Sequence, residues 1–160
     1  MTRLVCCHHL TSLLATYEIS INIHGLEIYV FWVNYRAIEA GTEVTLDEFI
    51  NDLILNAKVR AGVRGLYEEL ITVIKGLFKD SNIVTASDSQ LIWQLGQMGY
   101  IKAELVQELA DLLPIMQNVE KVENETIYSN LVRIMEDVEE CYVSIAVLKG
   151  QVRDDKRPDE

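Results

Sequence analysis

Residues 45–148 carry apolar side chains at every third or fourth position, a spacing that places them on one face of an α-helix. Residues 45–48 (TLDE) and 87–90 (SDSQ) match the capping box, which marks the start of a helix. Gly99 suits the end of a helix because glycine tolerates a positive φ. We therefore predict a mainly α fold in which residues 45–148 form a bundle of four to five helices.

The longest apolar stripes supply the expected core. The first stripe consists of Val63, Leu66, Tyr67, Leu70, Val73, Ile74 and Leu77, and the second of Ile127, Leu131, Ile134, Val138, Tyr142 and Ile145. The second stripe belongs to a helix predicted from about Thr126 to Leu148. Residues 56–60 are either a break or a continuation of a helix, and Pro114 would kink or stop the helix in which it lies.

The chain before residue 45 has a different pattern. Residues 18–33 alternate apolar and polar side chains, which is typical of a half-buried strand, and His24-Gly25 supplies a turn. We therefore predict a β-hairpin arm over residues 18–33. Residues 1–17 are predicted to be a poorly ordered N-terminal segment, and residues 149–160 a disordered tail with almost nothing to bury.

Charge narrows the range of partners. The chain has 160 residues, the length of one domain, with 25 acidic and 14 basic residues and a net charge of −11. Nucleic acids are bound through Lys and Arg that neutralise phosphates, so this balance argues against a nucleic-acid partner and against anionic membranes. The basic cluster of Lys58, Arg60 and Arg64 is typical of a solvated helix face.

A membrane anchor is the less favoured interpretation of the N-terminus. Residues 1–16 begin like a signal peptide, but His8 and His9 interrupt the apolar run. Residues 19–33 are too short and too polar for a span, which needs about 20 apolar residues. An anchor within residues 4–33 stays an alternative, and the main expectation is a cytoplasmic protein.

Neither a metal site, a cofactor nor a catalytic centre is predicted. Residues 6–9 (CCHH) have zinc-ligand side chains, but four contiguous residues cannot all face one ion. The odd number of cysteines is typical of reduced thiols, and Cys141 is best explained as an inert core residue. The acidic residues between 136 and 140 are typical of a solvated helix face. We expect no enzymatic activity, because the sequence contains no intact catalytic motif.

Residues 87–148 resemble the C-terminal part of HEPN-type helical domains. In that family a short helix and a glycine turn lead into a helix that ends at an Arg-Asn-x-x-x-His motif, and a closing helix follows. Here Gln117 and Asn118 stand at the Arg-Asn positions and Val122 at the His position. Because the Arg and His are implicated in RNA cleavage, the resemblance implies a non-catalytic member with a degenerate site. It also implies a homodimer, since the motif helices of the family commonly meet across a two-fold axis.

Three functions follow from these observations. The first is a non-catalytic interaction or regulatory module that associates with itself or with another protein, and the aromatic residues Tyr29, Phe31, Trp32 and Tyr35 are its candidate interface. A core position is the alternative for these four residues, and is somewhat favoured. The second is a HEPN-like protein of the toxin–antitoxin or defence type, associated with RNA or nucleotides. The third is a regulator anchored to a membrane by residues 4–33.

Overall fold

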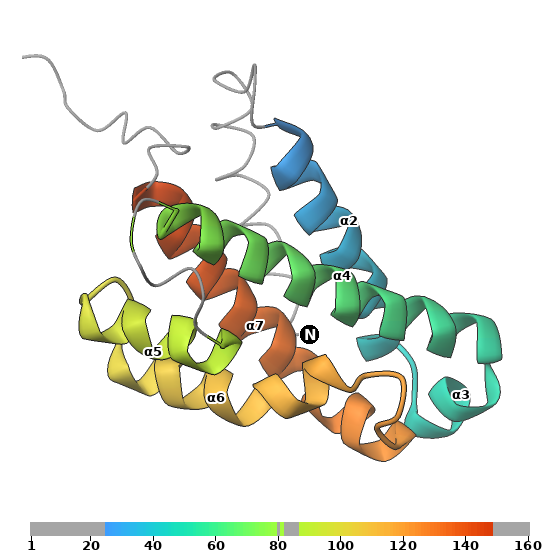
Figure 1. The fold of residues 1–160 in the computed structure, drawn as a ribbon. Helices are drawn as coiled ribbons and strands as arrows, with labels where there is room; N and C mark the ends of the chain where they lie inside the picture. Colours follow the sequence, from blue (N-terminus) through green and yellow to red (C-terminus); the bar gives the residue numbers. More distant parts are fainter. Residues whose placement is uncertain (1–24, 80, 82–86, 149–160) are drawn as a thin grey trace, which may run out of the picture.

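The computed structural model describes residues 25–79, 81 and 87–148. Within these ranges the chain forms six helices and no strand: α2 (Gly25–Thr42), α3 (Leu46–Asn51), α4 (Leu53–Leu77), α5 (Asp88–Gln97), α6 (Ala103–Gln117) and α7 (Asn124–Leu148). The two longest helices, α4 and α7, run through the middle of the bundle, and α2 packs against both of them (Figure 1). The α5–α6 pair covers the other side. The prediction of a mainly α fold is confirmed.

Both predicted capping boxes are present. At the start of α3, the Thr45 hydroxyl accepts a hydrogen bond from the Glu48 amide, and the Glu48 carboxylate accepts one from the Thr45 amide at 2.8 Å. Ser87 and Gln90 make the same reciprocal pair at the start of α5. Gly99, with φ +72°, follows the end of α5, where only a residue without a side chain adopts this conformation at little cost.

The described part of residues 45–148 forms five helices, α3 to α7, in agreement with the four to five predicted there, and Asp52 separates the first two. The Asp52 side chain accepts hydrogen bonds from the Ile54 and Leu55 amides, at 3.1 and 3.0 Å, and so ends α3 and begins α4. Residues 56–60 therefore continue a helix. Pro114 does not stop α6, which runs on to Gln117.

The prediction of the second strand of the β-hairpin is wrong, because residues 25–33 belong to α2. Phe31, Tyr35 and Ile38 are spaced by four and three residues, and Phe31 and Ile38 are fully buried. This helical spacing extends beyond residue 33 and overrides the short alternating pattern. The first strand, the N-terminal segment 1–17 and the tail 149–160 lie outside the described residues.

Glycine allows α2 and α4 to pack closely. A Cβ atom on Gly62 would lie 2.9 Å from the Ala37 Cβ and 2.9 Å from the Asn34 carbonyl oxygen, closer than such atoms can approach. The missing side chain thus brings the two backbones together, in agreement with the core position of Gly62. Among the described helices, none combines the length and the apolar character that crossing a membrane requires.

Candidate functional site

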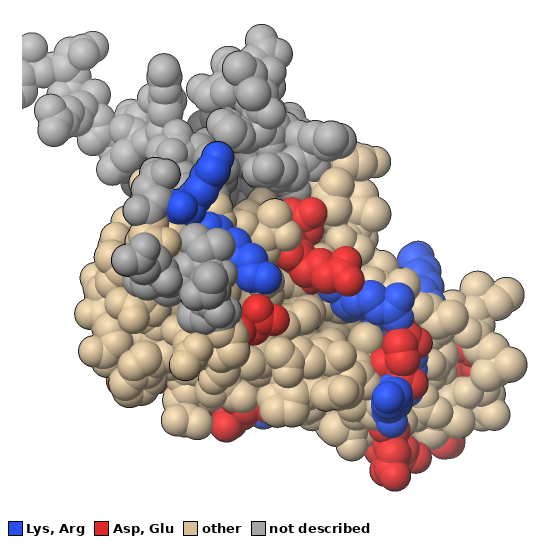
Figure 2. Space-filling model, in the orientation of Figure 1, with Lys and Arg blue, Asp and Glu red and all other residues tan. Residues whose placement is uncertain are grey.

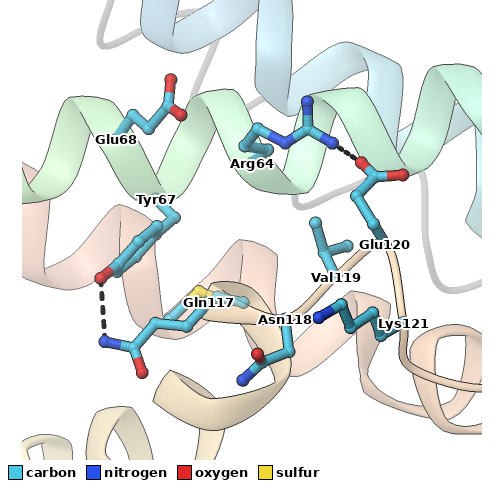
Figure 3. A pocket seen from close by; sticks show the side chains of 9 residues that line it. Arg64, Tyr67, Glu68, Gln117, Asn118, Val119, Glu120 and Lys121 are labelled. Carbon is cyan, nitrogen blue, oxygen red and sulfur yellow. Dashed lines mark hydrogen bonds and ion pairs between the residues drawn. The ribbon is translucent and has the colours of Figure 1, made fainter.

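A pocket of about 320 Å³ opens between the middle of α4 and the turn that joins α6 to α7 (Figure 3). Its lining residues come from three places: α4 provides Arg64, Tyr67 and Glu68, the end of α6 provides Met116 and Gln117, and the turn provides Asn118, Val119, Glu120 and Lys121. Two of the three degenerate motif positions, Gln117 and Asn118, therefore lie together in one pocket. The sequence resemblance had given no indication of which other residues would face them.

The amide side chains of Gln117 and Asn118 are both engaged in hydrogen bonds within the chain. Gln117 Nε2 donates to the Tyr67 hydroxyl at 3.1 Å (Figure 3). Asn118 Nδ2 donates to the Pro114 carbonyl at 2.9 Å, and the Asn118 backbone amide donates to the same oxygen at 3.2 Å. Asn118 thus satisfies a carbonyl in the last turn of α6, which would otherwise have no partner in the helix.

Tyr67 is held as a neutral phenol. Its hydroxyl donates a hydrogen bond to the Asp88 carboxylate and accepts one from Gln117. Burial, followed by the hydrogen bond to Asp88, raises the pKa of Tyr67 to about 12. The Lys75 Nζ atom lies 3.9 Å from the other oxygen of Asp88, so the Asp88 carboxylate also forms an ion pair with Lys75. Because a general base needs a pKa near the working pH, Tyr67 is poorly suited to accept a proton at neutral pH.

The charged side chains of the pocket balance one another. Arg64 forms an ion pair with Glu120 across the mouth (Figure 3). Lys121 and Glu68 complete a set of two basic and two acidic residues, so the formal charge of the lining is zero. Figure 2 shows acidic and basic side chains next to each other on this face, without a large patch of one sign. Such a lining has little electrostatic attraction for a polyanion.

The turn beneath the pocket is fixed by Arg60, one α-helical turn before Arg64. Its Nε donates to Asn56 Oδ1 and its Nη2 to Asn124 Oδ1, both at 2.8 Å, while its Nη1 donates to the Val119 carbonyl. Asn56 Nδ2 also donates to Asn124 Oδ1 at 2.8 Å. The prediction that Arg60 belongs to a solvated helix face is therefore wrong, because its guanidinium on α4 donates hydrogen bonds to the turn and to the start of α7.

The remaining motif position, Val122, does not line the pocket. It is partly buried and packs against the hydrophobic core, as an apolar residue at that place should. All three histidines of the chain precede residue 25, so the described residues contain none. Nor do the described residues contain a cluster of His, Cys, Asp and Glu that would hold a metal ion.

The four aromatic residues of the candidate interface divide between core and surface. Phe31 is fully buried and stacks on Tyr142 of α7, with ring centroids 4.1 Å apart. Trp32 and Tyr35 are partly buried and contact each other edge to face, at 5.0 Å. Tyr29 is 65% exposed. Whether any of them contacts a second protein stays a prediction.

Glu139 is the buried charged residue beside this aromatic group. Its side chain accepts a hydrogen bond from Tyr35, but its Oε1 atom is closed to solvent and has no hydrogen-bond partner. Burial raises the pKa of Glu139, and the nearby Glu136 raises it further, against the effect of the Tyr35 bond. A carboxylate in this position costs stability when it is charged.

A solved structure described as "Crystal structure of the toxin-antitoxin with AMP-PNP" has the same fold. The two chains share 17% sequence identity with a TM-score of 0.60, and the match covers 78% of this chain and 99% of the other. At this identity the likeness establishes the fold alone. No protein-family model and no curated protein sequence matches the chain.

Proposed function

We propose that this chain is a non-catalytic binding module of the toxin–antitoxin kind, which forms a homodimer with the degenerate motif pocket beside the contact. The non-catalytic part of this proposal rests on the hydrogen bonds that Gln117 and Asn118 make within the chain. Both amides line the pocket at the motif positions, yet each is occupied by a structural hydrogen bond. The fold shared with a toxin–antitoxin structure agrees with this assignment.

The chemistry of two lining residues, Tyr67 and Arg64, supports the non-catalytic part of the proposal. RNA cleavage needs a proton acceptor and a cation that can stabilise charge developing on phosphate. Tyr67 is protonated well above neutral pH, and the Arg64 charge is already neutralised by Glu120. Tyr67 is therefore not a proton acceptor at pH 7, and Arg64 does not offer a free positive charge.

The dimer contact that we propose runs along the outer side of α4. Leu53 is 77% and Ile54 84% exposed, and the exposed residues Ala57 and Ala61 follow Leu53 at four-residue intervals toward Arg64. This spacing places a narrow stripe on one face of the helix, where small side chains allow a second helix to approach. The stripe ends about one turn before Arg64, which lines the pocket, so the proposed contact on α4 lies beside the motif residues Gln117 and Asn118.

The test of the dimer is light scattering after size exclusion, at several protein concentrations. We expect a concentration-dependent dimer that Ala57→Arg weakens at least about tenfold, because the contact would bury an unpaired charge. The matched control is Ala103→Arg at the exposed start of α6, which should leave the dimer unchanged. A wild-type chain that stays monomeric at high concentration would refute the dimer.

The test of catalysis uses purified chain with single-stranded RNA, with and without a divalent cation. We expect no cleavage above the buffer background. Cleavage by the wild type that is lost in Tyr67→Phe, while the circular dichroism spectrum is unchanged, would refute the proposal. Titration with AMP-PNP should likewise give no saturable binding, because the lining carries no net positive charge. Tight binding that Arg64→Ala abolishes would instead favour a nucleotide-binding function.

A further inference from the structure

The dimer contact proposed on α4 has large apolar side chains at one end and an open pocket at the other. Leu53 and Ile54, at the start of α4, are the most exposed large apolar side chains among the described residues, at 77% and 84%. Arg64 follows Ala61 by three residues and Glu68 follows Arg64 by four, so both lie on the same face of α4 as the stripe. Both also line the motif pocket. The two ends therefore differ in shape, and the orientation of a second copy decides what each end meets.

A two-fold axis relates two copies of α4 either as a parallel or as an antiparallel pair. In a parallel pair each side chain comes level with its own copy, so Leu53 meets Leu53 and the two Arg64 guanidinium groups, which carry like charges, come together. In an antiparallel pair centred between Ala57 and Ala61, these small side chains lie at the crossing and allow a close approach. The antiparallel pair keeps the two Arg64 groups apart and is therefore the favoured orientation.

The antiparallel orientation also fixes which residues meet. Ala57 and Ala61 lie equally far from the midpoint, so each comes level with the other on the partner subunit. Ile54 precedes the midpoint by five residues and Arg64 follows it by five, which places each of them about 7.5 Å from it along the helix. Ile54 of one subunit therefore comes level with Arg64 of the other, at the mouth of the motif pocket.

We propose that, in the homodimer on which this inference rests, Leu53 and Ile54 of each subunit cover the motif pocket of the other. The pocket suits an apolar cover, because Met116 and Val119 contribute to its lining beside the ion pair that spans its mouth (Figure 3). Covering it removes the two exposed aliphatic side chains from water. The same contact closes both pockets of the dimer to RNA.

Disulfide trapping in the full chain tests which residues meet. Ile54→Cys and Arg64→Cys are made separately in a chain that also carries Cys6→Ser and Cys7→Ser, whereas the buried Cys141 is kept. After mixing and mild oxidation, we expect a disulfide-linked dimer that contains one chain of each kind. Ile54→Cys alone should give none, because its two copies lie about 15 Å apart along the helix and a disulfide joins Cα atoms within roughly 7 Å.

Light scattering of the same chains distinguishes this proposal from the dimer itself. A dimer that forms no mixed disulfide, or that links Ile54→Cys to its own copy, would overturn the proposed cover and leave the dimer standing. A chain that stays monomeric would overturn both. The control mixes Ile54→Cys with Lys75→Cys, because Lys75 is exposed on α4 but lies beyond the pocket. Equal trapping in this mixture would also count against the cover.

Hydroxyl-radical footprinting of the wild-type chain needs no substitution near the contact. As the concentration is raised and the dimer forms, oxidation of Leu53, Ile54 and Tyr67 should be lost together. Tyr29, 65% exposed on α2, is the control, and its oxidation should stay constant. Loss at Leu53 and Ile54 with unchanged oxidation of Tyr67 would place the contact outside the pocket and refute the proposal.

Discussion

Replacing Arg60 by methionine should loosen the turn that forms the floor of the pocket. The substitution keeps the length of the aliphatic stem and removes three hydrogen bonds, to Asn56, to Asn124 and to the Val119 carbonyl. A hydrogen bond within a protein contributes about 1 kcal/mol net. Because Arg60 is partly exposed and water replaces some of the lost bonds, we expect Arg60→Met to lower the free energy of unfolding by about 2–3 kcal/mol.

Urea denaturation followed by circular dichroism measures this change. For a chain of this length, each kcal/mol lowers the midpoint of thermal unfolding by about 2–4 °C, so the melting temperature should fall by roughly 5–10 °C. Lys58→Met is the matched control, because Lys58 is exposed on the same helix, and its effect should stay within about 0.5 kcal/mol. If Arg60→Met is as stable as this control, the guanidinium only exchanges water for protein partners and does not stabilise the turn.

Three further predictions concern buried side chains of α2 and α7. Phe31→Ala should cost about 3–5 kcal/mol of unfolding free energy in urea, because it empties the stack on Tyr142, whereas Tyr29→Ala should have little effect. Glu139→Gln should stabilise the chain at neutral pH, because it replaces a buried carboxylate by a neutral side chain. The pKa of Glu139 is raised in the folded chain, so its protonated form stabilises the fold fully below pH 4.5. This stabilisation is lost as the pH rises through the folded pKa. The gain over wild type should therefore be present at pH 7.5 and vanish at pH 4. Cys141, whose pKa burial raises to about 12, should not react with a thiol reagent at pH 8 until denaturant is added, in a variant whose other two cysteines are serine.

The start of α3 and both ends of α5 are predictable from sequence because local signals mark them. The capping boxes at Thr45 and Ser87 and the glycine after α5 act through residues within a few positions of each other. The start of α2 has no such signal. Leu26, Ile28 and Val30 alternate with Glu27 and Tyr29 as in a strand. The helical spacing that begins at Phe31 and the contacts of α2 with α4 and α7 favour the helix instead.

The pocket could be predicted only in part, since its two walls are far apart in the sequence. Gln117 and Asn118 are found through the motif, but Tyr67, the partner of Gln117, precedes it by 50 residues. Arg60 reaches a carbonyl 59 residues away. An arginine on an amphipathic helix looks the same in sequence whether it faces solvent or a neighbouring turn, so its role emerges only when the helices are packed.

Asn118, the one motif residue that matches, has a structural role in the turn after α6. Its side chain and its backbone amide both donate to the Pro114 carbonyl, and its own carbonyl accepts from the Lys121 and Val122 amides. Three of these four bonds use the Asn118 backbone and one uses its side chain, and together they end α6 and begin the turn. Position 117, by contrast, projects toward Tyr67, where Gln satisfies the phenol without adding charge. An Asn at the end of α6 is thus compatible with an inactive pocket, because its contribution here is to the backbone of the turn.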